Sequence, residues 1–435
     1  MAERPILFTG ARLVDPASGR DELADVLVVG EAIEAVGLGL AADGADAVDC
    51  AGLILAPGLV DLHTHLREPG FEHKETVETG TRAAAAGGFT AVASMANTDP
   101  VTDHAGVVAE IRDKAAAAGL CDVFPVGAIT KGLAGESIAE LGEMVEAGVR
   151  VFSDDGNCVP SARVLRNAMI YAKAFGDEVV IADHCEDPSL VEGGQMHEGA
   201  HSYSLGLAGR PAEAEELVVA RDLALARATG GRLHVCHLSS ARAVELIRRA
   251  KAEGIRVTAE VTPHHLVFTD DDLVTYDTNL KVNPPIRTAE DRDALRAGVA
   301  DGTIDVIATD HAPHAVEEKE AEFDHSPPGT IGLETALAAV LTHLVRPGIV
   351  PLARALEAMT VTPARILGAA GHGGPIAAGR PANLVVFHPE EGWVAEAPFV
   401  SKARNSSFLG RELAGRVHHT MLRGTLTVAD GKVTR

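Results

Sequence analysis

Eight short apolar segments, separated by longer helix-like stretches, run through the middle of this chain and constrain its fold more than any other feature. Segments this apolar are typical of strands that are covered on both faces, as in a parallel sheet. The stretches between them are rich in Ala, Glu, Leu and Arg, which favour helix, and Gly often follows them, as at helix ends. The pattern predicts an α/β fold, a (β/α)8 barrel of the TIM type. The expected strands span residues 53–66, 90–96, 122–129, 149–153, 178–184, 232–237, 256–261 and 304–309, and the clearest helices 75–86, 105–118 and 213–229.

The two ends of the chain differ from its middle and contain short β-like runs with tight turns. Such runs occur at residues 6–8 and 26–29, and again at 383–387 and 422–433, where Asp430-Gly431 favours a hairpin turn. Neither end is long enough for a good sheet alone, so we expect both to combine into a small β-sandwich. The predicted domains are therefore residues 1–54 with 372–435, and a barrel over 55–371.

Composition narrows the classes of partner. The formal charge is -24 and aromatic residues make up 3% of the chain. A nucleic-acid groove needs positive charge, often with stacking rings, so we exclude nucleic acid as the main partner. No apolar stretch approaches the roughly 18 residues of a membrane span, and no apolar signal segment follows Met1. The five cysteines are scattered, which favours free thiols and a cytoplasmic location.

A pair of histidines, His63 and His65, ends the most apolar run in the first third of the chain. Side chains two positions apart on a strand point to the same face, so both imidazoles aim at one point. Imidazole is a good ligand for zinc and its first-row neighbours. Such a pair also occurs on ordinary half-exposed strands, so it does not establish a metal site by itself.

Four further predicted strands also end in polar residues. Asp154 and Asp155 follow the fourth strand, His184 the fifth, His237 the sixth and Asp310 the eighth. Catalytic residues of a barrel lie at these carboxyl ends. Each residue alone has an ordinary explanation, as a core histidine or a helix cap, but their joint placement predicts a metal centre. Six such donors exceed what one tetrahedral zinc binds and suit two metals about 3.5–4 Å apart.

Several other histidines have no such placement. His234 lies three residues before His237 and points to the opposite face, so we expect a structural role or one that supports the site. We expect surface positions for His197, His201, His372, His418 and His419.

These residues resemble the amidohydrolase superfamily and, within it, the dihydroorotases of the bacterial class whose two metals are bridged by an aspartate. Residues 61–70 and 308–314 are similar to the two signatures of that family, and residues 281–287 and 234–239 to further blocks of it. The resemblance covers nearly the whole chain.

The resemblance implies a site with one or two Zn²⁺ ions. In related cyclic amidases a carboxylated lysine bridges the metals, whereas this chain has Asp154-Asp155 at that position. The choice of Asp155 as the bridge, with Asp154 outside the ligand set, comes from the resemblance. The implied ligands are His63, His65 and Asp310 for the first metal, His184 and His237 for the second, and Asp155 between them.

The implied reaction is the reversible cyclisation of N-carbamoyl-L-aspartate to L-dihydroorotate plus water, in de novo pyrimidine (UMP) biosynthesis. A metal-bound hydroxide would attack the ring carbonyl, with Asp310 as general acid and base. Residues 314–329 would form a mobile lid. This chain departs from the family at two points: it has Met95-Ala96-Asn97 where the family usually has Met-Pro-Asn, and its lid lacks the aromatic residue that often precedes the glycine. The implied substrate contacts are His65, Arg67, Asn97, Asn283, His314, Pro328 and Gly329.

Two other functions stay open at this point. One is another cyclic amidase, such as a hydantoinase, dihydropyrimidinase or allantoinase. Arg67, which can bind a carboxylate with two parallel hydrogen bonds, favours an anionic substrate instead. The other is a non-catalytic partner of aspartate transcarbamoylase, which the complete ligand set disfavours. The resemblance also implies a homodimer or a complex with aspartate transcarbamoylase.

Overall fold

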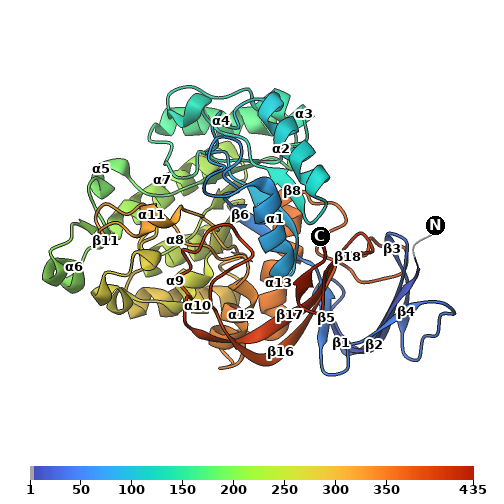
Figure 1. Cartoon of the computed structure of the whole chain (residues 1–435). Coiled ribbons are helices and arrows are strands. Elements are labelled where there is room, and N and C mark those ends of the chain that lie inside the picture. The colour runs from blue at the N-terminus through green and yellow to red at the C-terminus, as the bar shows by residue number, and fades with distance from the viewer. Residues whose placement is uncertain (1–3) are drawn as a thin grey trace.

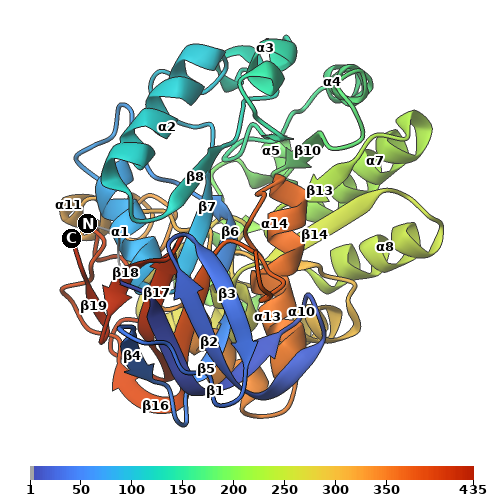
Figure 2. The ribbon, with the colours of Figure 1, turned by 90° about the vertical axis from the view of Figure 1, so that its right-hand side faces the viewer.

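The computed structural model describes residues 4–435, so residues 1–3 of the predicted terminal domain lie outside the described residues. A barrel of parallel strands, covered by helices, makes up most of the molecule (Figure 1). A β domain built from both ends of the chain packs beside it, and its strands lie together at the lower edge of the barrel in Figure 2.

Eight parallel strands form the barrel in the described part of the chain, in sequence order around the ring. Hydrogen bonds join them in two groups, and parallel bridges between Gly127 and Phe152 and between Thr64 and His311 close the ring. The strands are β6 (Leu59–Thr64), β7 (Phe89–Ser94), β8 (Asp122–Pro125), β9 (Val151–Phe152), β10 (Val180–Asp183), β13 (Leu233–Val235), β14 (Val257–Val261) and β15 (Val306–Ile307).

The strand expected over residues 53–66 is in fact two strands. Its first part, β5 (Ile54–Pro57), pairs with strands of the terminal sheet, and only β6 enters the barrel. The break falls at Gly58, where an added Cβ would lie 2.3 Å from the Thr90 side chain. The run is apolar on both sides of this glycine, so the sequence pattern did not reveal the division.

Helices follow the strands and cover the outside of the barrel (Figure 1). Two expected helices have the predicted bounds, and the third begins at Val77 because the Thr76 hydroxyl caps it by accepting from the Thr79 N–H. The helices that directly follow barrel strands or cover them are α1 (Val77–Ala86), α2 (Ala105–Ala118), α3 (Leu141–Glu146), α4 (Ala162–Lys173), α7 (Glu213–Thr229), α8 (Ala241–Ala252), α10 (Ala289–Asp301) and α13 (Leu352–Met359). Other elements are α5 (Pro188–Val191), β11 (Met196–His197), α6 (Ala200–Leu205), β12 (Gly209–Arg210), α9 (Pro263–Val267), α11 (Val316–Lys319), α12 (Ala336–Val340), α14 (Val361–Leu367), η1 (Lys131–Leu133), η2 (Asp270–Thr275), η3 (Thr278–Leu280) and η4 (Leu341–Val345).

Strands from both ends of the chain form one nine-stranded sheet, as the β-like runs at both termini predicted. The antiparallel pairing of β5 with β16 joins the N-terminal half of this sheet to the C-terminal half. Its remaining strands are β1 (Ile6–Asp15), β2 (Arg20–Val29), β3 (Ala32–Gly37), β4 (Asp46–Asp49), β16 (Leu384–Val394), β17 (Glu412–Leu422), β18 (Thr425–Ala429) and β19 (Lys432–Val433).

Side chains of the barrel strands alternate between an inner and an outer apolar cluster. On β10, Val180 and Ala182 lie in the cluster inside the barrel, whereas Ile181 packs in the larger cluster toward the helices. This period of two directs His184, two residues after Ala182, toward the barrel axis. From α14, Ile366 and Leu367 join the inner cluster.

Two of the histidines expected at the surface are buried, so that expectation was wrong for them. His372 and His419 are each 7% exposed. His372 hydrogen-bonds to Thr90 of the barrel and to Asp122, and His419 packs edge-on against Phe8. His372 lies against the barrel, whereas His419 lies within the terminal sheet, and contacts between distant segments leave no periodic signal in the sequence.

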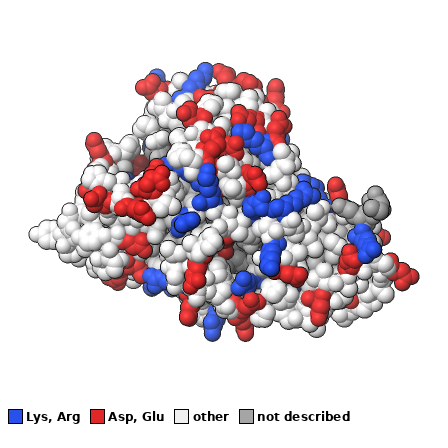
Figure 3. All heavy atoms as spheres, viewed as in Figure 1, with Lys and Arg blue, Asp and Glu red and all other residues white. Residues whose placement is uncertain are grey.

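The surface agrees with the composition. On the face drawn in Figure 3, basic side chains are interspersed with more numerous acidic ones and form no continuous basic stripe. Across residues 4–435, the helices are all too short or too polar to cross a membrane.

Candidate metal centre

All six residues predicted to bind metal lie together at the carboxyl ends of the barrel strands. None is more than 7% exposed. The donor atoms of His63, His65 and Asp310 all lie within 4.8 Å of one another, and so do those of His63, Asp155 and His237. His63 belongs to both groups, so the two candidate metal positions adjoin each other.

Asp155 lies at the centre of this cluster. Its carboxylate oxygens are 3.3 Å from His63 Nε2 and 3.3 Å from His237 Nε2. Asp154 faces the other way and accepts hydrogen bonds from the backbone N–H groups of residues 129–130. Neighbouring residues of an extended segment point in opposite directions, so only one of the two aspartates reaches the cluster.

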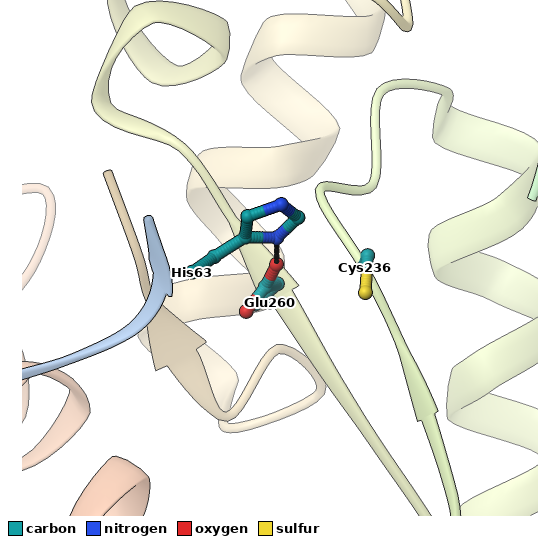
Figure 4. Close-up of side chains that lie close together, drawn as sticks. All are labelled: His63, Cys236 and Glu260. Carbon is teal, nitrogen blue, oxygen red and sulfur yellow. Dashed lines mark hydrogen bonds and ion pairs between the residues drawn. The ribbon is translucent and has the colours of Figure 1, made fainter. Parts of the chain in front are cut away.

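Two carboxylates outside the predicted set hold the histidines in place. Glu260, at the end of β14, accepts from His63 Nδ1 at 2.6 Å and from His234 Nε2 at 3.1 Å. Figure 4 shows the His63 ring directed at Glu260, with Cys236 beside them, directly after the end of β13. Burial raises the pKa of the Cys236 thiol well above its ordinary value, so this side chain stays neutral. His234 therefore supports the site through Glu260, which is one of the two roles that the sequence left open for it.

Glu186 does the same for His184. It accepts from His184 Nε2 at 3.0 Å and also pairs with Arg210 at 3.1 Å. The other nitrogen, His184 Nδ1, is 3.0 Å from His237 Nε2 and faces the cluster. Carboxylates that bind the far nitrogen of a metal-ligating histidine fix its orientation and tautomer. A charged residue such as Glu260 within an apolar strand was a signal that sequence reasoning could have used.

The charges of the cluster set its protonation. Burial lowers the pKa of His63, but the carboxylates of Asp155 and Glu260 outweigh it and raise that pKa well above the ordinary value. Burial also acts to lower the pKa of His184, but the carboxylates of Asp155 and Glu186 outweigh it and raise that pKa to about 10. Burial also acts to raise the pKa of Asp310, but the charge of His63 holds it below its usual range. Metal binding would therefore have to displace protons from these imidazoles.

Three site residues have a left-handed backbone conformation. The φ angles are 63° at Arg67, 29° at His237 and 48° at Asp310. Side chains other than glycine rarely adopt this region, and such strain is concentrated at functional sites. Here the sharp turns occur where the chain leaves a strand and the side chain enters the site.

A cavity of about 270 Å³ lies over the cluster. A cavity of about 560 Å³ between α12 and the strands β16 and β17 is larger, but none of the predicted site residues lines it. Chemistry rather than size therefore identifies the candidate site. The residues predicted to contact substrate all line the smaller cavity: His65, Arg67, Asn97, Asn283, His314, Pro328 and Gly329.

Arg67 and Asn97 offer different groups to a ligand. The Arg67 Nε–H donates to the Pro313 carbonyl at 3.1 Å, and its two terminal nitrogens have no hydrogen bond within residues 4–435. Burial lowers the pKa of Arg67 to about 10, so the guanidinium remains charged at neutral pH. The amide oxygen of Asn97 accepts from His65 Nδ1 at 2.9 Å, so Asn97 also orients a histidine of the cluster, which the sequence did not predict.

His314, Pro328 and Gly329 cover the cavity. The His314 Nε2–H donates to the Pro328 carbonyl at 2.9 Å. An added Cβ at Gly329, whose φ is 140°, would lie 2.8 Å from His314 Nε2 and 2.9 Å from the Ala312 Cβ. Glycine is required for this close approach.

The donor set fits one or two divalent metal ions. The nitrogen and oxygen donors are those that zinc and its neighbours bind. His63 Nε2 is buried and has no hydrogen-bond partner in the described chain, yet it faces the carboxylates of Asp155 and Asp310 at 3.3 and 3.5 Å. A cation among these groups would satisfy that nitrogen and offset the charge of both carboxylates.

Comparison with known proteins identifies relatives over the full length. A family model described as dihydro-orotase-like matches residues 52–243. A dihydroorotase from Streptomyces coelicolor is 54% identical over 95% of this chain and 97% of its own. A dihydroorotase from Leifsonia xyli subsp. xyli is 52% identical over 100% and 98%.

Solved structures with the same fold are more distant in sequence. The L-hydantoinase (dihydropyrimidinase) from Arthrobacter aurescens has a TM-score of 0.88 at 28% identity and covers 100% of this chain and 98% of its own. The dihydropyrimidinase from Brevibacillus agri has a TM-score of 0.84 at 24% identity over 99% and 96%, which shows the fold alone. The much higher identity to the full-length dihydroorotases decides between the two groups. This chain belongs to the dihydroorotase family, whose members are metal-dependent hydrolases of a cyclic amide.

Proposed function

We propose that this chain catalyses the reversible conversion of N-carbamoyl-L-aspartate to L-dihydroorotate and water, a step of de novo pyrimidine synthesis. The observation that carries the proposal is one cavity with the six-donor cluster at its floor and Arg67 in its wall. The cluster suits attack on a cyclic amide, and the arginine suits a carboxylate.

In the proposed site, Zn²⁺ would be held by His63, His65 and Asp310, with His184 and His237 holding a second ion and Asp155 bridging the two. When bound, the metal supplies a polarised ring carbonyl and a water of lowered pKa. Asp310 would take up the proton of the attacking water and give it to the departing ring nitrogen. In the direction of ring closure, Asp310 would remove the carbamoyl proton instead.

The other cavity residues would bind and orient the substrate. The free nitrogens of Arg67 would bind its α-carboxylate through two parallel hydrogen bonds, together with Asn97. Asn283 and His314 would contact the ring from the sides, and Pro328 and Gly329 would cover it. Fixing the ring in this way brings its reacting atoms into line and removes an entropic cost from the barrier.

Several other features stay predictions from the sequence. They are a cytoplasmic location, a homodimer, and a complex with aspartate transcarbamoylase. The division into residues 1–54 with 372–435 and a barrel over 55–371 also stays a prediction, although the pairing of β5 within the terminal sheet favours a first division at Gly58.

The test compares Arg67→Ala with the wild type on two substrates, after the metal content of both has been measured. We expect kcat/KM for dihydroorotate to fall about ten- to a hundredfold, the loss of one charge-assisted contact. Turnover of the uncharged ring dihydrouracil should change little. The exposed Arg249→Ala is the control. Equal losses on both substrates would contradict the carboxylate contact, and a wild type that hydrolyses only dihydrouracil would contradict the proposed function.

A further inference from the structure

Residues 320–329 cover the site cavity, and we name them the roof segment. Two buried lysines contact this segment. Lys281 directly follows η3 and is 5% exposed, and Lys319 is the last residue of α11 and is 7% exposed. Lysine is almost never fully buried without a partner. The proposed chemistry uses neither side chain.

Both amino groups bind the backbone of the roof segment. Lys319 Nζ donates to the carbonyls of Pro327 and Gly329 at 2.9 and 3.1 Å. Lys281 Nζ donates to the carbonyls of Phe323 and Asp324 at 2.6 and 3.2 Å. Among residues 4–435, all hydrogen bonds from these two amino groups go to carbonyls of this one segment.

The backbones of the two lysines are fixed as well. The Lys281 N–H donates to the Thr278 carbonyl at 3.1 Å, and the Lys319 carbonyl accepts from the Thr278 hydroxyl at 2.5 Å. The Lys281 carbonyl also accepts from the Gly329 N–H of the roof segment at 2.8 Å. The roof segment is therefore held at both of its ends by residues that are themselves anchored.

Burying these amino groups is costly, which points to a role beyond filling space. Burial lowers the pKa of Lys281 to about 8 and that of Lys319 to about 7. An apolar side chain of similar length would occupy the same volume without this desolvation. What only lysine supplies here is a set of N–H donors for the carbonyls of the roof segment.

The lysine contacts also set which way those carbonyls point. Lys319 lines a second cavity of about 270 Å³, which shares only His314 with the lining of the site cavity. Lys319 does not line the site cavity, so its hydrogen bonds draw the carbonyl oxygens of Pro327 and Gly329 away from that cavity. Asn405 Nδ2 also donates to the Gly329 oxygen at 3.1 Å, and His314 binds the oxygen of Pro328. A carboxylate in the site cavity then faces fewer negative carbonyl ends.

We propose that Lys281 and Lys319 are positioning residues that hold the roof segment closed over the cavity and keep its carbonyl oxygens directed away from an anionic substrate. The inference rests on the proposed function for the charge of the substrate. The closure itself does not depend on that function and can be measured without substrate.

The test uses the metal-loaded full chain with Lys319→Met, which keeps the length of the side chain and removes its donors. Hydrogen–deuterium exchange of the roof segment should become at least about fivefold faster without substrate, while the barrel strands exchange as in the wild type. The KM for dihydroorotate should rise about tenfold, with kcat changed less than about threefold. Lys281→Met should act in the same direction. The control is Lys131→Met, which removes an exposed lysine that pairs with Glu140.

Two results would overturn the proposal. One is a hydrogen-exchange rate of the roof segment and a KM that both stay within about twofold of the wild type, because the loss of the charged Lys319 donor should change them by more than that. The other is faster exchange throughout the barrel, which would mean that the lysine supports the whole fold. If Lys319→Met does not fold, Thr278→Val removes only the hydrogen bond to the Lys319 carbonyl, and unchanged roof exchange in that variant also overturns the proposal. A wild type inactive on dihydroorotate would contradict the proposed function, while the exchange data still decide on the closure.

Discussion

The floor and the roof of the site cavity are built on different principles. The floor consists of ionisable side chains at strand ends, and two of them, His63 and His184, are each held by a further carboxylate. The roof consists of backbone, and its carbonyls are held by the side chains of Lys281 and Lys319. Strands of a closed barrel hold side chains to small tolerances, whereas a loop can be adjusted or opened.

The difference between floor and roof corresponds to two different tasks, chemistry and enclosure of the substrate. Groups that move protons or bind metal need fixed mutual distances, so the floor should tolerate little change without loss of turnover. Groups that enclose the substrate need to open and close, so changes to the roof should weaken binding before they affect chemistry. Four experiments test this contrast.

The largest effect is expected at the floor from Asp310→Asn. The amide keeps the shape of the side chain but cannot act as a general base, so kcat for dihydroorotate should fall at least about a hundredfold. Steady-state kinetics measure this, with metal content and melting temperature determined on the same sample. Near-normal kcat in a fully metal-loaded variant would show that Asp310 is not the proton carrier. The exposed Asp301→Asn is the matched control.

Glu260→Gln should weaken metal binding at the floor indirectly, because Glu260 is not itself one of the proposed ligands. The amide cannot accept from His63 and His234 as the carboxylate does, so the orientation of His63 is lost. Metal affinity should fall about ten- to a hundredfold, as for other residues behind a metal ligand. Competition with a chelator measures this. An unchanged affinity would mean that His63 is held by packing alone, and Glu245→Gln on the surface of α8 serves as control.

The pH dependence of metal binding should follow from the raised pKa of His184, about 10 in the folded metal-free protein. An unfolded histidine loses its proton near pH 6.5. The retained proton therefore stabilises the metal-free fold fully below about pH 6.5, and this stabilisation is lost as the pH rises through about 10. Metal must displace the same proton, so affinity should rise about tenfold per pH unit for each proton released over that range.

Chelator competition at several pH values, with proton release followed by an indicator, measures this slope. Glu186→Gln removes one of the groups that raise the pKa of His184, so in this variant the rise of metal affinity with pH should stop at a lower pH. Affinity that does not change between pH 6.5 and 10 would contradict the protonation of the floor described above.

The smallest effect is expected at the roof from Gly329→Ala. The new Cβ would collide with His314 and Ala312, and its φ of 140° is unfavourable for alanine. The roof should sit less closely over the cavity, with KM raised about fivefold and kcat nearly unchanged, consistent with a strain of about 1 kcal/mol. Gly254→Ala, at φ 76° with open space around it, controls for backbone strain alone. A fall in kcat larger than the rise in KM would break the contrast between floor and roof.

Most of the barrel and of the inward-facing floor followed from local pattern. Two rules were enough to single out the histidines and one aspartate of the floor: side chains alternate along a strand, and catalytic residues lie at the carboxyl ends of barrel strands. These residues are His63, His65, His184, His237 and Asp310. The same reasoning left Asp154 and Asp155 as alternatives, because both follow the end of the fourth strand, where its alternation no longer fixes which of them faces inward. The burial of His372 and His419 was missed because it depends on contacts between segments that lie far apart in the chain.

The sequence by itself determined the fold class and the histidines and Asp310 at the strand ends, because both depend on spacings of a few residues. The tertiary structure alone decided what stands behind those residues. Glu260 is 197 positions from His63, and Lys281 is 42 from the Phe323 carbonyl that it binds. Such partners have no fixed spacing in the sequence, because they come together only when strands and loops from distant parts of the chain pack.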